Sequence, residues 1–198
     1  MSATARIPTP TIADPEAALE AVTGRRSVGK LTTPAPTDAE LTTMLEAACT
    51  APDHGRLRPW RFVVLRGEVR RELGDAFARA EMTRNGEAGD PAAASTKALR
   101  APVIVTVIAR TSPHPKVHEW EQLVAAGCAA QNLCIAATAH GYGSMWRTGW
   151  QAEHPEVLAT LGLGEDERIV GFVYLGTVAA GFRPPPRVVD TSCVTFRD

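Results

Sequence analysis

Residues 123–139 read LVAAGCAAQNLCIAATA and form the longest apolar stretch of the chain. The stretch is rich in alanine and carries the amides Gln131 and Asn132, which makes it short and polar for a helix that crosses a membrane. We therefore predict that residues 119–140 form a helix buried inside the protein, with the other elements packed around it.

Runs of β-branched and aromatic residues on either side of this helix predict the strands of a sheet. They cover residues 62–65 (FVVL), 103–109 (VIVTVIA) and 169–175 (IVGFVYL). Branched side chains favour strands because they pack well on a pleated surface. A further strand is expected at residues 144–147, since Gly-Tyr-Gly at residues 141–143 ends the central helix.

A first helix is predicted ahead of any strand. Asp14, followed by proline, is a typical start, and Gly24 can end the helix. Ala18, Leu19 and Val22 give it an apolar side.

Other helices are predicted from capping residues and spacing. Thr37 and Glu40 form a capping box at the start of a second helix. Residues 69–77 carry apolar side chains four apart, and a short helix follows Pro155. Residues 84–94 are rich in Gly, Asp and Asn and predict a mobile loop. Helices that alternate with a few strands in this way indicate an α+β fold. A classical dinucleotide-binding unit is not expected, because no glycine-rich dinucleotide or phosphate loop follows a strand.

The composition is that of one soluble domain. The chain has 198 residues and a formal net charge of −1, so it lacks the overall positive field that nucleic acid binding uses. No signal-peptide pattern is present, and the four cysteines lack C-x-x-C spacing, which favours reduced thiols in the cytoplasm. We expect a flexible extension at residues 1–13 and a single domain over residues 14–198. Its end is expected to be a C-terminal arm laid over a neighbouring subunit, or else disordered, because prolines 184–186 cannot join a central strand.

Three segments carry side chains suited to binding a cofactor. Arg25-Arg26-Ser27 offers paired donors to a phosphate, although cations are also common near a helix C-terminus for other reasons. Residues 51–62 place His54 in a polar loop, which is otherwise an ordinary connection to a strand. In residues 141–149, glycines allow a flat ligand to approach, while Trp146 could equally be a core residue.

Other chemistry finds less support in the sequence. The histidines share no metal-ligand spacing, so no metal site is expected. Asp53 beside His54 has no serine or cysteine nucleophile at a strained turn, which argues against a hydrolase triad.

Taken together, the three segments resemble the nitroreductase family, most closely its small bacterial members. The match runs from Arg25-Arg26-Ser27 through Ala51-Pro52-Asp53-His54 to Pro59-Trp60 and covers about residues 16–178. Further matching segments are Ala101-Pro102, Trp120-Glu121-Gln122, Ala126-Gly127-Cys128-Ala129, Gly141-Tyr142-Gly143, Trp146-Arg147-Thr148-Gly149 and residues 169–177.

The resemblance implies an intertwined homodimer with a central antiparallel or mixed sheet, flanking helices and FMN at each subunit interface. It also implies which positions bind FMN: Arg25, Arg26, Ser27, Thr50, His54, Trp146, Arg147 and Thr148, with Thr50 and His54 reaching in from the partner. It assigns the nicotinamide cofactor to Ala136, Ala137, Thr138, Ala139, His140 and Gly141. Thr50 and the 55–58 loop depart from the family's pattern.

The implied activity is hydride transfer from NADH or NADPH to FMN, followed by reduction of a nitroaromatic, quinone or related small-molecule acceptor in a ping-pong cycle. The flavin carries the chemistry, so no catalytic side chain is assigned. Three alternatives remain: a non-catalytic FMN store or sensor, a flavoenzyme of the same fold that acts on a specific metabolite, and a structural dimer without cofactor.

Overall fold

The computed structural model describes residues 13–186 and 188–197. The expected flexible extension at residues 1–13 therefore lies almost entirely outside the described residues.

Five strands form the sheet, and every pair of neighbouring strands is antiparallel. The order is β1-β5-β3-β2, and β4 pairs with the same edge of β5 as β1 does. The strands are β1 (Leu31–Thr32), β2 (Trp60–Arg66), β3 (Val103–Arg110), β4 (Gly143–Arg147) and β5 (Glu167–Val178). The strands expected from the apolar runs are all present, together with the short β1, which the sequence analysis missed.

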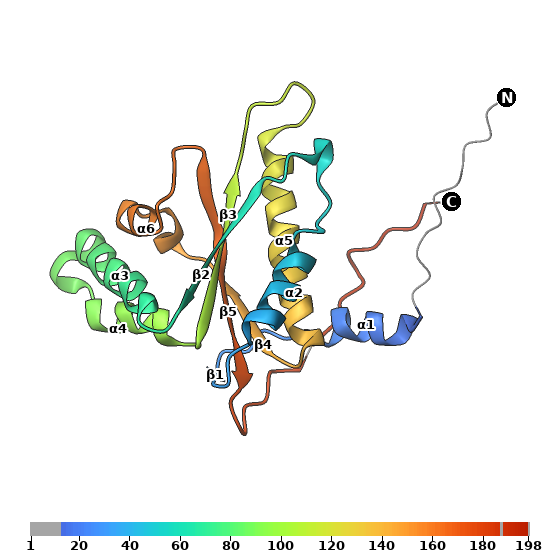
Figure 1. The fold of residues 1–198 in the computed structure, drawn as a ribbon, viewed down its shortest axis with the longest axis horizontal. Helices are drawn as coiled ribbons and strands as arrows, with labels where there is room; N and C mark the ends of the chain where they lie inside the picture. Colours follow the sequence, from blue (N-terminus) through green and yellow to red (C-terminus); the bar gives the residue numbers. More distant parts are fainter. Residues whose placement is uncertain (1–12, 187, 198) are drawn as a thin grey trace.

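Helices cover both faces of this sheet (Figure 1). On one face lie α2 (Asp38–Ala48) and α5 (Glu119–Ala139), packed on alternate residues of β3 such as Val103 and Val105. On the other lie α3 (Val69–Asn85), α4 (Pro91–Thr96) and α6 (Pro155–Thr160). Because both faces are covered, β3 is buried along nearly its whole length, which explains its unbroken apolar sequence.

The central helix α5 is buried as predicted, and its small side chains allow close packing. Ala126, Ala129 and Ala130 are fully buried against the sheet. Among the described residues, one helix has the length and apolar composition of a membrane span, and that helix is α5. Of its most apolar 18-residue stretch, 44% is buried inside the fold. These contacts identify a core helix. At its C-terminus, Gly141 (φ 79°) donates to the Thr138 carbonyl, which ends the helix in a Schellman-type turn.

The predicted mobile loop at residues 84–94 is wrong for most of its length. The helix α3 continues to Asn85, a 3₁₀ turn covers Gly86–Ala88, and α4 begins at Pro91. The Asp90 carboxylate accepts a hydrogen bond of 2.9 Å from the Ala93 N–H, so Asp-Pro acts here as a helix cap. Asp90 is thus one of the residues whose type predicted a loop but which here begins a helix.

The first helix, α1 (Pro15–Gly24), begins at the predicted cap, and its apolar side is exposed in the single chain. None of its residues is buried, and Leu19 is 64% exposed. The tail after β5 has no helix or strand among its described residues and exposes Val188, Val189 and Phe196. The chain thus presents apolar side chains at both ends of its described length.

Candidate functional site

The arginine segment after α1 is joined to the start of β4. The Val28 N–H donates to the Ser144 carbonyl at 2.9 Å, and Ser27 forms a parallel bridge with Ser144. This contact brings the first predicted segment beside the third. Arg25 and Arg26 are half-buried here, and Ser27 is exposed.

A pocket of about 430 Å³ lies at this junction. Its lining residues come from the arginine segment, from α5 and from β4: Arg25, Ser27, Gln131, Cys134, Trp146 and Thr148. Four of these are residues that the sequence analysis assigned to FMN, and we call this cavity the junction pocket. Arg26 lies next to it in the chain without lining it. Gln131 and Cys134 were missed, although their spacing on a predicted helix places them on one face.

The environment of the thiol in the junction pocket disfavours its reactive form. Burial raises the pKa of Cys134, while Ser144 and the positive charge of Arg25 act in the opposite direction. Because the thiolate is the reactive form, a raised pKa lowers its share at neutral pH. The pocket therefore offers binding groups rather than a covalent catalyst.

Trp146 is both a core residue and a wall of the junction pocket. Its indole N–H donates to the Val170 carbonyl at 3.3 Å, and the ring packs against the α5 cluster. It lies so close to β5 that a Cβ atom on Gly171 would sit 2.1 Å from the indole nitrogen. The two interpretations of Trp146 left open by the sequence are thus compatible, since one part of the ring fills the core and another lines the cavity.

Arg147 and Thr148 continue β4 into a second cavity of about 170 Å³. Arg147 lines it together with Lys97, Arg100 and Tyr174. Thr148, just after β4, lines both this cavity and the junction pocket, whose other lining residues lie on opposite faces of the sheet. We call the smaller cavity the cationic pocket. Nothing in the sequence around Lys97 suggested it.

Thr50 and His54 do not line the junction pocket of their own chain. The Thr50 hydroxyl donates to the Ala47 carbonyl at 2.7 Å at the end of α2. The His54 side chain is 58% exposed, and its Nδ1 lies 2.8 Å from a carboxylate oxygen of Glu121. That carboxylate also accepts from the His118 N–H at 3.0 Å, and both contacts lower the pKa of Glu121. The loop of His54 is thereby tied to the start of α5.

The loop that carries His54 holds a strained backbone. Arg56 and Arg58 have φ values of 56° and 49°, a region that costs a residue with a side chain roughly 1–2 kcal/mol. The Asp53 carboxylate accepts from the N–H groups of Leu57 (3.1 Å) and Arg58 (2.6 Å), which holds this shape. Strain of this kind is concentrated at binding sites in proteins.

The residues assigned to the nicotinamide cofactor form the end of α5 and its turn. Ala137 is buried, whereas Ala139 and His140 are exposed at the helix terminus. None of residues 136–141 lines the junction pocket, so their role stays a prediction.

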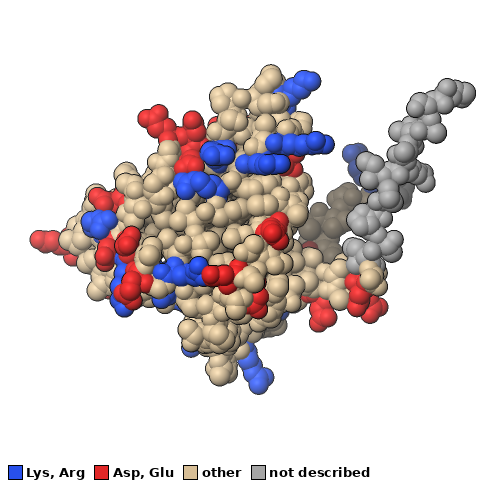
Figure 2. Space-filling view, viewed as in Figure 1, with Lys and Arg blue, Asp and Glu red and all other residues tan. Residues whose placement is uncertain are grey.

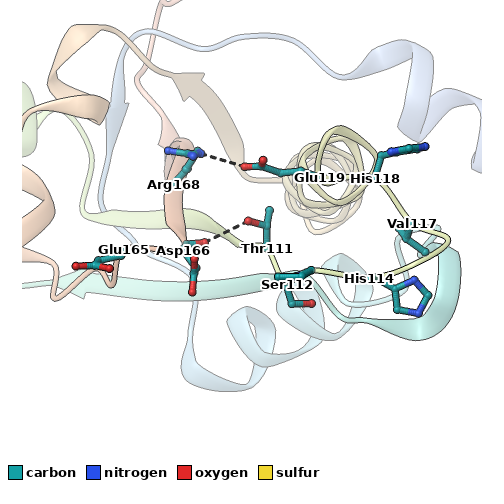
Figure 3. A pocket seen from close by; sticks show the side chains of 10 residues that line it. Thr111, Ser112, His114, Val117, His118, Glu119, Glu165, Asp166 and Arg168 are labelled. Atoms are coloured by element: carbon teal, nitrogen blue, oxygen red, sulfur yellow. Dashed lines mark hydrogen bonds and ion pairs between the residues drawn. The ribbon is translucent and has the colours of Figure 1, made fainter.

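A further cavity of about 430 Å³ lies near the start of α5 and contains none of the predicted residues (Figure 3). Arg168 donates to Glu119 at 3.4 Å, and the carboxylates of Glu165 and Asp166 also line the cavity, so its lining does not favour an anion. On the face drawn in Figure 2, basic and acidic side chains are likewise interspersed. An anion on this protein must therefore be held by a local cluster of cations.

The chain is similar to known proteins over most of its length. The model of the nitroreductase family matches residues 22–177. The candidate NAD(P)H nitroreductase YdjA of Escherichia coli K12 is 39% identical over 160 residues, which are 81% of this chain and 87% of that protein.

Solved structures support the same grouping. A nitroreductase-like family protein from Bacillus cereus superposes with a TM-score of 0.77 at 24% identity, over 96% of this chain and 99% of that one. A nitroreductase from Bacteroides fragilis with bound FMN gives a TM-score of 0.73 at 26% identity, over 91% and 98% of the two chains. These matches confirm the predicted α+β fold.

The close approach of Trp146 to β5 generates a testable prediction. Gly171→Ala should force the indole out of place, because the added Cβ would lie 2.1 Å from its nitrogen and 2.9 Å from the Arg147 carbonyl. We expect a loss of about 1–3 kcal/mol in the free energy of unfolding in urea, with a change in near-ultraviolet circular dichroism. Gly164→Ala is the control, since its Cβ would meet nothing within 4 Å. Equal stability of the two variants would contradict the packing described.

Proposed function

This chain belongs to the nitroreductase family, and we propose that it is an FMN-dependent oxidoreductase that takes hydride from NADH or NADPH. It passes the electrons to a nitroaromatic, a quinone or a related small-molecule acceptor. We further propose that it works as a soluble cytoplasmic homodimer and binds neither nucleic acid nor a membrane.

The observation that carries this proposal is the convergence of distant residues on the junction pocket. Arg25 and Ser27 arrive from the loop after α1, and Trp146 and Thr148 arrive from β4. The family resemblance had assigned all four to one cofactor. The similar nitroreductase from B. fragilis, at 26% identity, contains bound FMN, which supports the same assignment.

The residues present fit FMN by their chemistry. A phosphate dianion requires cations and hydrogen-bond donors, and Arg25, Arg26 and Ser27 supply both. A flat ring requires an apolar wall, which Trp146 provides. The volume of about 430 Å³ falls within the range of roughly 300–1,000 Å³ that small-molecule sites occupy.

FMN, when bound, supplies the acceptance and release of hydride. The chain's own residues bind and orient it: Arg25 and Arg26 anchor the phosphate, and Trp146 flanks the ring. Arg147 places a fixed positive charge beside the site, where it stabilises negative charge that develops on the cofactor during reduction. A protein nucleophile is not needed, which agrees with the raised pKa of Cys134.

A site used first by the donor and then by the acceptor gives ping-pong kinetics. We propose that residues 136–141, at the end of α5, contact the nicotinamide cofactor. Ala139, His140 and Gly141 are the exposed members of this segment, which a bound molecule can reach.

The proposed homodimer explains features that a single chain leaves unused. Leu19 on α1, Trp120 and Val124 on α5, and Phe196 in the tail are apolar and exposed. Burying such side chains against a second copy is favourable. Thr50 and His54 lie outside the junction pocket of their own chain, which agrees with their expected approach to the partner's cofactor.

The activity is tested by visible spectroscopy under anaerobic conditions. The purified protein, supplied with FMN, should show the absorbance of oxidised flavin and lose it when NADH or NADPH is added. Admission of a nitroaromatic or a quinone should restore it. A flavin that stays oxidised with both donors would instead indicate an FMN store or sensor, and a protein that takes up no FMN would indicate a structural role.

The anchor role is tested by Arg25→Ala. A charge-assisted hydrogen bond contributes about 1.5–3 kcal/mol, so we expect FMN to bind at least tenfold more weakly, measured by quenching of flavin fluorescence. The control is Arg71→Ala, which removes an exposed arginine of α3 that pairs with Glu68. An Arg25→Ala protein with unchanged FMN affinity would refute the anchor.

The homodimer is tested by light scattering after gel filtration. The expected mass is twice the 21.1 kDa of one chain. Trp120→Glu should lower it, because Trp120 is 63% exposed in the single chain and a charge there opposes burial. Val69→Glu, on an exposed position of α3, is the control. A monomer that retains full FMN content would contradict a shared site.

A further inference from the structure

We propose that Glu121 is a positioning residue, whose carboxylate fixes the ring of His54 so that the Nε2 atom is presented to the FMN of a second copy of the chain. Glu121 lies in the first turn of α5, and His54 lies in the loop after α2. The inference deepens the proposed function and rests on it, because that function has His54 reaching the partner's cofactor.

The loop of His54 is packed against the start of α5 (Figure 1). A Cβ atom on Gly55 would lie 3.2 Å from the side chain of Val117, two residues ahead of the helix. Gly55 has a φ of 80°, which glycine adopts without a steric cost. This close approach brings the imidazole of His54 beside the helix, where its Nδ1 lies 2.8 Å from Oε2 of Glu121.

Both oxygens of the Glu121 carboxylate are in use. Oε1 accepts a hydrogen bond of 3.0 Å from the His118 N–H, and Oε2 faces the His54 ring. The His118 N–H, and after it His54, lower the pKa of Glu121, so this group is ionised at neutral pH and can only accept. The Nδ1 atom of His54 therefore carries the proton of their contact.

The proton on Nδ1 determines what the other ring nitrogen offers. Nε2 has no hydrogen-bond partner within the described part of the chain, and the side chain of His54 is 58% exposed. In a neutral ring with its proton on Nδ1, Nε2 is an acceptor, and in a charged ring it is a donor. The edge of an isoalloxazine ring carries both an N–H group and carbonyl oxygens, so it can bond Nε2 in either state.

Stability alone does not account for this arrangement. An ion pair with one partner as exposed as His54 contributes little to the free energy of unfolding. Capping of α5 requires one acceptor, which a glutamine at position 121 supplies as well as a glutamate. The second carboxylate oxygen is required only by His54, on a loop whose strained backbone is of a kind that is concentrated at binding sites.

The first experiment determines the tautomer of His54 by nitrogen NMR of the imidazole ring at alkaline pH. We expect Nδ1–H in the wild-type protein and Nε2–H in Glu121→Gln. The single oxygen of a glutamine must accept from the His118 N–H, because a backbone N–H cannot change its role, so the amide NH₂ group faces Nδ1 and makes it an acceptor.

Glu119→Gln is the matched control for this measurement. It removes the same charge from the same turn of α5, but Glu119 pairs with Arg168 instead of His54. This variant should keep the Nδ1–H tautomer, and loss of the signal in His54→Ala assigns it. A wild-type protein with the Nε2–H tautomer, or a Glu121→Gln protein that keeps Nδ1–H, would overturn the proposal.

The second experiment measures FMN affinity in a double-mutant cycle, by quenching of flavin fluorescence. Glu121→Gln should weaken binding about fivefold, as the loss of one well-placed hydrogen bond does. In the His54→Ala background the same substitution should change FMN affinity no further, whereas an effect on helix capping would persist in the unfolding midpoint. Equal losses of affinity in the two backgrounds, or a His54→Ala protein with unchanged affinity, would contradict a role through His54.

The outcomes separate this inference from the proposed function. A protein with the expected tautomers and the expected cycle, but whose flavin is not reduced by NADH or NADPH, would refute the proposed activity alone. A protein that is reduced by a nicotinamide donor, but whose His54 tautomer is the same in all variants, would refute the role of Glu121 alone.

Discussion

The hydrogen bond from the Val28 N–H to the Ser144 carbonyl is the contact on which the site depends. It joins the loop after α1 to the start of β4, although the two residues are more than a hundred positions apart in the sequence. Without it, Arg25 and Ser27 would lie on a surface loop next to an exposed helix, with no second wall. The bond fixes the backbone on both sides of the junction pocket, so the arginine side chains start from a defined position and lose less entropy when they bind.

A second constraint holds β4 in place from the other side. Trp146 fits against β5 only because Gly171 has no side chain, and its indole N–H is satisfied by the Val170 carbonyl. The strand that carries Trp146, Arg147 and Thr148 is therefore located by packing as well as by its ladder with β5. Residues on a strand that is located in this way are held more precisely than residues on a loop. A site for electron transfer between stacked molecules requires such precision.

The sequence predicted well what depends on local patterns. The Thr37–Glu40 capping box, the buried alanine-rich helix and the runs that became β2, β3 and β5 are all properties of neighbouring residues. It failed at residues 84–94, where an Asp-Pro pair caps α4, because the same pair occurs in loops. It also failed to place Lys97 and Arg100 near Arg147, since proximity across a fold leaves no local signal. The four junction-pocket residues that we assign to FMN were selected through an ordered set of motifs, because each motif alone was ambiguous.

The two pockets lie on either side of β4, and one strand serves both. The junction pocket offers cations, a hydroxyl and an indole wall, and its volume is that of a small-molecule site. The cationic pocket gathers Lys97, Arg100 and Arg147 in a smaller volume. Because successive side chains of a strand alternate, β4 presents Trp146 to one pocket and Arg147 to the other, so a shift of this strand would change both cavities at once.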